Sequence, residues 1–502
     1  MKINKFLSLF AIAVVCFPMT ACNSKNENGN ENNSNASVVL NVYNSAEYIC
    51  ETDIETDTVG TIDLFEQYCK EQFNTDVHVN YSTFETNEDM YNQLKAGGVR
   101  YDLVCPSDYM IEKMIMSDMI GPLSAPVENY ETYGSNYIKD TFNNIETHTG
   151  DGTVVKFGAY AVPYMWGTLG FMYDPNPQGI AEGLDIEEAV SSWDVFWDPN
   201  YKNKSSLKDS IRDTYAVGAL HVYKEELRFA KELLEAGKIT IAEYNNKVGE
   251  IMNRCDDDTL TLVESSLKKA KENVYEFEVD TGKEHIVKGD YWINFCWSGD
   301  AVYALDLADE ENFTLNYKVP EEGSNVWFDG WVMPKGANKV WAERLMNFLC
   351  DPEIAALNMD AVGYTSAMAG QEMWDLVVDW YDEEESEDTV EYDLTYFFEN
   401  TGIVDEDDNE MTSFIIHTSE INRQLYAQYP DKETIARCAV MKDFGAQNDK
   451  VSELWIRVKG NTTSWYLYVI LGVVVVVIIF AEVKSILNRK TRKNRNKTKN
   501  KA

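Results

Sequence analysis

Residues Trp327 to Trp331 read Trp-Phe-Asp-Gly-Trp and combine three aromatic rings with a single carboxylate. Aromatic faces attract cations, and a carboxylate can hydrogen-bond an ammonium group directly. Gly330 removes side-chain bulk beside Asp329. This combination suits a flexible organic amine better than a metal ion, which prefers several oxygens and no rings. A buried aromatic cluster with an incidental surface Asp is the alternative interpretation of these five residues.

The net charge of −40 is unevenly distributed along the 502 residues. Residues 1–37 carry +1 and residues 461–502 carry +8, so the segment between them holds −49. Such a charge repels nucleic acid and draws cations towards any cleft, so we exclude a nucleic-acid-binding protein. The aromatic content of 12% and the apolar content of 44% are those of a folded chain. Its length suffices for two or three compact units.

The amino terminus has the pattern of an export signal. Two lysines and the apolar run from Phe6 to Phe17 precede the tetrapeptide Met19-Thr20-Ala21-Cys22. That tetrapeptide resembles the lipobox of bacterial lipoproteins, which implies a signal peptide at 1–21 and lipidation of Cys22. An ordinary secretory signal is the alternative. Residues 22–37, rich in Asn, Ser and Glu, are interpreted as a flexible linker.

A second membrane anchor is predicted near the carboxyl terminus. Trp465 to Ala481 contains no charged residue and is dominated by Val and Ile. Aromatic residues stand at its outer edge and basic residues crowd its far side, which predicts a transmembrane helix over 465–483 and a basic cytoplasmic tail over 484–502. A buried core helix is the alternative. We therefore expect the acidic segment on the extracellular or periplasmic face of the cell membrane, anchored by lipid at Cys22 and by a single-pass helix.

The segment after the linker alternates between strand and helix patterns. The expected elements are strands at 38–43, 76–81 and 101–105, and helices at 61–73 with Thr61 as its cap, at 87–96, and after Pro106. This order predicts an α/β fold with a parallel sheet, and ligands in such folds bind beyond the carboxyl ends of strands. The loops 44–48 and 106–109 occupy those positions. Further along, we expect strands at 151–173, interrupted by Gly167 and Gly170, and at 290–297, and helices at 225–254, 260–272 and 342–350.

Cysteine and histidine spacing gives no sign of a metal site or cofactor. Seven cysteines follow Cys22, with wide spacings and no Cys-x-x-Cys pair, so buried free thiols are expected for most, and one or two disulfides remain an alternative. The five histidines form no metal-ligand or catalytic-triad spacing. We therefore expect no metal, no cofactor and no catalytic residues.

Seven ordered motifs carry a resemblance to a known family. They are Tyr43-Asn44-Ser45-Ala46-Glu47-Tyr48, Tyr81 to Glu88, Tyr101 to Tyr109, Val162 to Gly167, Ser192-Trp193-Asp194, Trp297-Ser298-Gly299-Asp300 and Trp327-Phe328-Asp329. In this order they resemble the polyamine (spermidine/putrescine) substrate-binding proteins of ABC importers, a bacterial extracellular solute-binding lipoprotein family. The resemblance implies a two-lobed periplasmic-binding-protein fold over 38–460, closing on a linear polyamine. Lobe 1 would comprise 38–164 and 330–415, and lobe 2 would comprise 165–329 and 416–460.

The same resemblance implies which residues contact the ligand. The expected acids are Glu47, Asp213, Asp300 and Asp329, the expected rings are Tyr48, Trp297 and Trp327, and Ser107 and Tyr109 are expected as lesser contacts. Three positions depart from the family pattern: Ser45 where a Trp is usual, Ser210 where spermidine-preferring members carry an Asp, and Met441 where Gln is common. Asp300 instead resembles putrescine-preferring members. The resemblance thus implies the class of ligand and leaves the choice of amine open.

The expected function follows from the acids, the rings and the anchors. The chain would be the solute-binding component of an ABC importer, capturing spermidine or putrescine and delivering it to a permease whose ATPase subunits use ATP. A surface sensor of amines, or a binder of another small organic cation, is the alternative. A secreted carbohydrate-active enzyme using paired carboxylates is a further alternative. The expected partners are the polyamine, the permease with its ATPase subunits, and membrane lipid.

Overall fold

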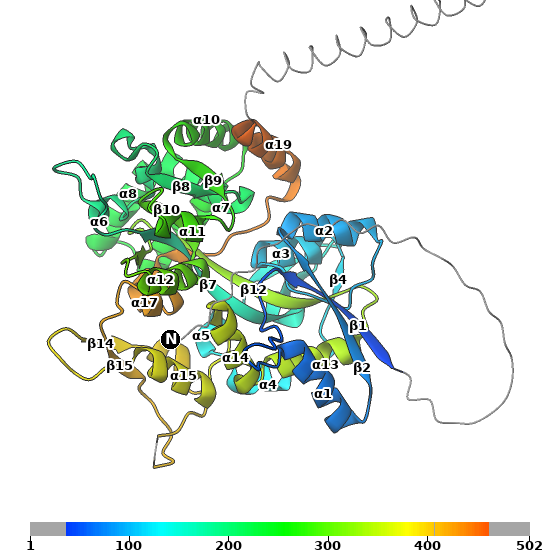
Figure 1. The fold of residues 1–502 in the computed structure, drawn as a ribbon. Helices are drawn as coiled ribbons and strands as arrows, with labels where there is room; N and C mark the ends of the chain where they lie inside the picture. The colour runs from blue at the N-terminus through cyan, green and yellow to red at the C-terminus, as the bar shows by residue number, and fades with distance from the viewer. Residues whose placement is uncertain (1–36, 406, 461–502) are drawn as a thin grey trace, which may run out of the picture.

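A computed structural model describes residues 37–405 and 407–460 (Figure 1). The chain forms two groups of helices and strands, and two long strands, β7 and β12, run from one group into the other (Figure 1). The first group contains the amino-terminal strands, coloured blue, and the second contains the green helices around β8 and β9. The expected two-lobed α/β architecture is thus confirmed at the level of the fold.

Twelve strands of the described chain belong to one sheet. Its strands are β1 (Val38–Ser45), β2 (Val77–Phe84), β3 (Leu103–Val104), β4 (Ile120–Gly121), β7 (Ala161–Tyr173), β8 (Ser205–Lys208), β9 (Glu276–Glu278), β10 (Ile293–Trp297), β11 (Asn316–Lys318), β12 (Ser324–Pro334), β13 (Thr365–Ser366) and β16 (Cys438–Ala439). Two hairpins lie outside it, formed by β5 (Glu146–His148) with β6 (Val154–Lys156) and by β14 (Val390–Asp393) with β15 (Ile415–Thr418).

Ten α-helices of the described residues precede β9. They are α1 (Thr61–Phe73), α2 (Asn87–Ala96), α3 (Asp108–Met116), α4 (Glu128–Tyr133), α5 (Asn136–Thr141), α6 (Ile186–Ala189), α7 (Ile211–Val222), α8 (Lys224–Glu235), α9 (Ile241–Met252) and α10 (Asp257–Asn273). The later helices are α11 (Gly282–Val287), α12 (Ser298–Glu310), α13 (Lys339–Leu349), α14 (Pro352–Val362), α15 (Gln371–Tyr381), α16 (Thr395–Phe398), α17 (Gln424–Gln428), α18 (Lys432–Ala436) and α19 (Asn448–Lys459).

The order of neighbouring strands is β2-β1-β3-β12-β7-β10-β8-β9. β1 pairs in parallel with β2 and β3, and β8 pairs in parallel with β9 and β10. β12 and β7 are antiparallel to each other and to their outer neighbours β3 and β10. The sheet is therefore mixed, with a parallel section in each lobe and an antiparallel connection between them. The parallel sections have their carboxyl ends near that connection.

The six expected elements up to residue 116 are confirmed, with one local difference at the start of α1. Helix α1 begins at Thr61, as its first helical residue, and Gly60 is the cap; the Thr61 hydroxyl instead donates to Asn358 Oδ1 at 2.7 Å. A further expectation, that Gly167 and Gly170 interrupt a strand, is wrong, because both lie within continuous β7. Gly167 lies opposite Trp327. A Cβ at position 167 would lie 2.5 Å from Cζ2 of Trp327, so this glycine allows the indole to pack against the strand.

Several sequence-based expectations concern residues outside the described part. The signal peptide at 1–21, Cys22, most of the linker at 22–37, the transmembrane helix at 465–483 and the tail at 484–502 lie there. Within residues 37–405 and 407–460, no helix is both long enough and apolar enough to cross a membrane. All seven cysteines of this part are free thiols, and six of them are buried. The lobe boundaries stay predictions.

Candidate functional site

The predicted ligand-binding side chains come from the carboxyl ends of strands in both lobes. Tyr48 follows β1, Ser107 follows β3, and Trp297 is the last residue of β10. Asp329 lies on β12 where the pairing with β7 shifts register, between Asp329 and Gly330. A bulge of this kind re-aims a side chain relative to a regular strand. Asp213 and Asp300 lie in the first turns of helices α7 and α12.

Asp329 has one hydrogen bond and one unpaired oxygen. The Tyr48 hydroxyl donates to Oδ2 at 2.7 Å, and Tyr48 itself is buried. Oδ1 is buried and has no hydrogen-bond partner among the described residues. Burial raises the pKa of Asp329 to about 6, with Asp213 contributing in the same direction and the nearby hydroxyl groups of Ser107 and Tyr48 opposing it. This carboxyl group thus lacks a cation to stabilise its charge.

Asp213 is a second carboxyl group whose pKa is raised by burial. It is buried, and within the described chain it makes no ion pair. Burial raises its pKa, while hydrogen bonds from the Ser210 and Trp297 side chains and the charges of Lys208 and Arg212 oppose the shift. Asp213 therefore lies between Trp297, which donates a hydrogen bond to it, and Asp329, whose pKa its charge raises.

Glu88, which the sequence analysis did not select as a ligand contact, lies on the same side. It accepts a hydrogen bond from the Tyr109 hydroxyl at 3.2 Å. Burial raises the pKa of Glu88, and the nearby charge of Asp213 adds to the effect. Asp108 is also buried, and its carboxylate accepts hydrogen bonds from the backbone N–H groups of Tyr109 and Phe328. Asp108 therefore fixes the chain around Asp329.

Asp300 has the opposite environment. Its Oδ2 accepts a hydrogen bond from Lys208 Nζ at 2.8 Å, and its Oδ1 accepts one from the Tyr364 hydroxyl at 2.8 Å. Lys283 Nζ lies 3.6 Å from Oδ1. Burial opposes ionisation of Asp300, but the two lysine charges overcome it and hold the pKa of this carboxyl below its usual range. Asp300 is therefore an ionised and fully paired carboxylate.

Tyr364 lies between Asp329 and Asp300 in this cluster, and the sequence analysis did not identify it. Its ring contacts the Tyr48 ring edge-to-face at 5.1 Å between centroids and the Trp327 ring at 5.8 Å. A Cβ at Gly299 would lie 2.3 Å from the Tyr364 ring, so the absence of a side chain at Gly299 allows the ring to approach α12. The residues around Tyr364 thus form a continuous aromatic wall from Asp329 to Asp300.

Eight of the nine predicted ligand contacts lie in one connected cluster. The ninth, Glu47, lies at the surface. Glu47 is exposed, has a left-handed backbone with φ of 52°, and lies close enough to Lys283 to contribute to raising the pKa of that lysine. The expectation that three rings surround Asp329 is wrong in part. Phe328 packs against Phe142, and Trp331 packs against Tyr164, both in the core. Alternation along the strand directs Phe328 away from its neighbours.

Lys208 is the most informative residue that the sequence analysis missed. It ends β8, which pairs in parallel with β10, so that Lys208 and Trp297 reach the same edge of the sheet. The parallel order of β8 and β10 could have placed them together if β8 had been recognised. No group of His, Cys, Asp or Glu side chains in the described residues is arranged to hold a metal ion.

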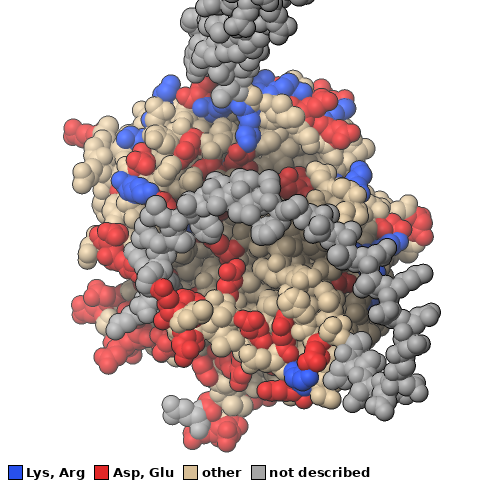
Figure 2. Space-filling model, turned by 45° about the vertical axis from the view of Figure 1, so that its right-hand side comes forward, with Lys and Arg blue, Asp and Glu red and all other residues tan. Residues whose placement is uncertain are grey.

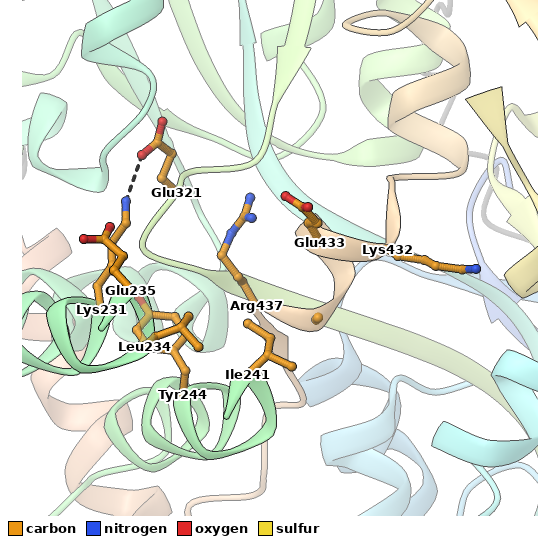
Figure 3. A pocket seen from close by; sticks show the side chains of 10 residues that line it. Lys231, Leu234, Glu235, Ile241, Tyr244, Glu321, Lys432, Glu433 and Arg437 are labelled. Carbon is orange, nitrogen blue, oxygen red and sulfur yellow. Dashed lines mark hydrogen bonds and ion pairs between the residues drawn. The ribbon is translucent and has the colours of Figure 1, made fainter. Parts of the chain in front are cut away.

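A cavity of about 490 Å³ lies away from this cluster, between α8, α9 and α18 (Figure 3). Both basic and acidic side chains line this cavity. The Lys231 ammonium forms an ion pair with Glu321 at 2.9 Å (Figure 3). The lining contains one ring, Tyr244, whose hydroxyl donates to the Glu322 carbonyl. We therefore base the candidate site on the carboxyl and aromatic cluster and not on this cavity.

One face of the molecule carries more acidic than basic side chains. Figure 2 shows acidic side chains spread across the visible face and more numerous than basic ones. This agrees with the excess of 84 Asp and Glu over 44 Lys and Arg in the whole chain. Such a surface favours the approach of a cation.

Comparisons with known proteins show what the chain as a whole is similar to. The family model described as bacterial extracellular solute-binding protein matches residues 63–373. The spermidine/putrescine-binding periplasmic protein of Escherichia coli is 29% identical over 303 residues, which are 60% of this chain and 72% of that protein. The putrescine-binding periplasmic protein of the same organism is 26% identical over 332 residues, 65% of this chain and 77% of that protein.

A solved structure is similar as well. The chain resembles the spermidine/putrescine ABC transporter substrate-binding protein of Streptococcus pneumoniae with a TM-score of 0.52 and 25% identity. The match covers 84% of this chain and 98% of that protein. The similarity therefore extends through both lobes.

Proposed function

Because this chain belongs to the family of bacterial extracellular solute-binding proteins, whose members bind solutes and are not enzymes, we propose that it captures a polyamine, putrescine or spermidine. It would deliver the amine to an ABC permease with ATPase subunits. The observation that carries the proposal is the half-buried carboxyl group of Asp329, whose buried Oδ1 has no hydrogen-bond partner among the described residues. Buried Asp213, which forms no ion pair in the same part of the chain, supports it.

The chemistry of a polyamine fits these groups. An ammonium nitrogen can donate to the free Oδ1 of Asp329 while Tyr48 keeps Oδ2. The rings of Trp327 and Tyr364, 5.8 Å apart, offer apolar and cation-attracting faces for the alkyl chain and its charges. Closure of the two lobes around the amine would exclude water and strengthen these contacts.

The anchors complete the proposal. A lipid at Cys22 and a membrane span at 465–483 would hold the binding domain on the outer face of the cell membrane, close to the permease. The names of the E. coli relatives support a periplasmic or extracellular site of action for the domain. Fractionation of cells with and without Cys22→Ala would test the lipid anchor.

Calorimetry tests the central claim. The purified full-length chain in mild detergent is titrated with putrescine and with spermidine, and the titrations are repeated with Asp329→Asn. We expect binding of at least one amine, weakened about 30- to 1,000-fold in the variant, because truncating a buried charge pair costs about 2–4 kcal/mol. Asp388→Asn changes an exposed acid of the same type and should leave the affinity unchanged. A folded protein that binds neither amine refutes the proposal.

A further inference from the structure

Lys208 lies where the ligand-binding residues of the second lobe meet. Its ammonium nitrogen is 2.8 Å from Oδ2 of Asp300 and 4.1 Å from the centre of the Trp297 ring. A carboxylate beside an aromatic face is the combination that recognises an organic ammonium group. One side chain of the protein thus already occupies a place with the chemistry of an amine-binding subsite.

The position of Lys208 is fixed from several sides. Its ammonium donates to the Val279 carbonyl at 2.5 Å, and Glu278 Oε1 lies 4.0 Å away. The side chain is 2% exposed. A buried lysine is costly unless it is paired, and here two carboxylates, a carbonyl and a ring surround it. The Asp300 carboxylate is likewise fully paired, with the ammonium groups of Lys208 and Lys283 and with the Tyr364 hydroxyl.

Asp329, at the other end of the cluster, has no such internal cation in the described part of the chain, whereas Asp213 is influenced by the charges of Lys208 and Arg212 without forming an ion pair with either. Asp329 receives only the neutral Tyr48 hydroxyl within normal hydrogen-bond geometry, and Asp213 forms no ion pair among the residues described. The two ends therefore differ in whether the protein itself supplies the positive charge. An amine entering the cluster meets unpaired carboxyl groups at one end and a paired one at the other.

We propose that Lys208 is a built-in cation that fills the subsite formed by Asp300 and Trp297, and so determines which amines the site accepts. This inference rests on the proposed capture of a polyamine. The ammonium groups of the ligand are confined to the region of Asp329 and Asp213, and Lys208 takes the place that a further ammonium group would need. The site therefore selects short amines over longer ones, and Lys208 is a specificity-determining residue.

The first test is a crystal structure of the protein with putrescine bound. We expect a ligand nitrogen within hydrogen-bond distance of Asp329, and Lys208 Nζ still on Asp300 and over Trp297. A ligand nitrogen bonded to Asp300, with Lys208 displaced from the ring, overturns the inference while leaving the proposed function intact. This measurement uses the unaltered chain and does not depend on how any variant folds.

The second test removes the internal charge and keeps the apolar stem. Lys208→Met should raise the affinity for spermidine relative to putrescine about 10-fold or more, because the extra ammonium of spermidine gains a buried carboxylate. Lys204→Met is the matched control, since Lys204 lies 4.3 Å from the Trp292 ring and outside the cluster. Its spermidine-to-putrescine ratio should match that of the unaltered protein.

The outcomes distinguish the role of Lys208 in specificity from the proposed capture of a polyamine. An unchanged ratio in a folded Lys208→Met variant, or a ratio that falls, means that Lys208 has only a structural role and refutes the inference. Failure of the unaltered, folded protein to bind either amine refutes the proposed function and this inference with it.

Discussion

Asp300, which is buried, and Asp329, which is half-buried, are two carboxyl groups of one cluster, and they differ in the partners that the fold supplies to them. Asp300 is held by two lysines and a tyrosine hydroxyl, which keep its pKa low. Asp329 has one tyrosine hydroxyl and a pKa raised by burial to about 6. The comparison teaches that an acid and a ring do not by themselves identify a ligand contact. Under the proposed function, a ligand contact also needs a charge that the protein leaves uncompensated.

Replacing Asp300 should have the largest effect on stability. Asp300→Asn leaves the buried Lys208 without its nearest carboxylate, and breaking one partner of a buried pair costs about 3–5 kcal/mol. Because the folded-state pKa of Asp300 is lowered, its contribution is present at neutral pH and is lost as pH falls through that lowered value. Urea denaturation at pH 7 measures the change. Asp309→Asn is not a suitable control, because Asp309 pairs with Arg423, so exposed Asp388→Asn serves instead. A loss below about 1 kcal/mol contradicts the tight pairing.

Replacing Asp329 should change the free energy of unfolding in the opposite direction, towards greater stability. Its folded-state pKa is raised above the unfolded value, so the folded protein binds more protons between about pH 4 and pH 6 and loses stability as pH rises through that window. Asp329→Asn should therefore stabilise the ligand-free protein by up to about 3 kcal/mol at pH 8, and by little at pH 4. Thermal unfolding at the two pH values measures this. Destabilisation at pH 8 would show that Asp329 is compensated as Asp300 is.

The aromatic wall between the two acids can be disturbed without changing a charge. Gly167→Ala would place a Cβ 2.3 Å from Ser298 Oγ and 2.5 Å from the Trp327 ring. We expect a loss of about 1–3 kcal/mol in stability through overpacking, and weaker amine binding as the indole shifts. Calorimetry and urea denaturation measure both effects. Gly98→Ala is the control, since a Cβ there meets no atom within 4 Å. Equal behaviour of the two variants would mean that β7 can shift to accommodate the methyl group.

The smallest expected effect concerns the single bond that Asp329 does have. Amine affinity should fall about 10-fold per pH unit below pH 6, because the ammonium binds the ionised carboxylate. Tyr48→Phe removes a hydrogen bond that favours ionisation and should move the midpoint of this pH profile upwards by about one unit. Calorimetry with putrescine from pH 5 to pH 8 measures the profile. Tyr275→Phe, at a half-exposed ring, should leave it unchanged. A midpoint that does not move would mean that Asp329 does not bind the amine.

Much of the architecture could be predicted from the sequence because it depends on local patterns. Apolar spacing identified β1, α1, β2, α2, β3 and α3, and the parallel arrangement placed the loops of Tyr48 and Ser107 at one edge of the sheet. The motif order also selected eight residues that the structure brings together. The sequence could not show that Trp331 packs against Tyr164 in the core, because the direction of that side chain depends on the bulge between Asp329 and Gly330.

The sequence by itself determined the class of the protein, its acidic charge and the acids and rings that could meet an amine. Only the tertiary structure decided which of those acids are free. Lys208 is 92 residues from Asp300, and Tyr364 is 64 residues from it, so neither contact can be predicted from local spacing. Burial then makes each pairing decisive, because a charge removed from water must find its partner within the protein or in a ligand.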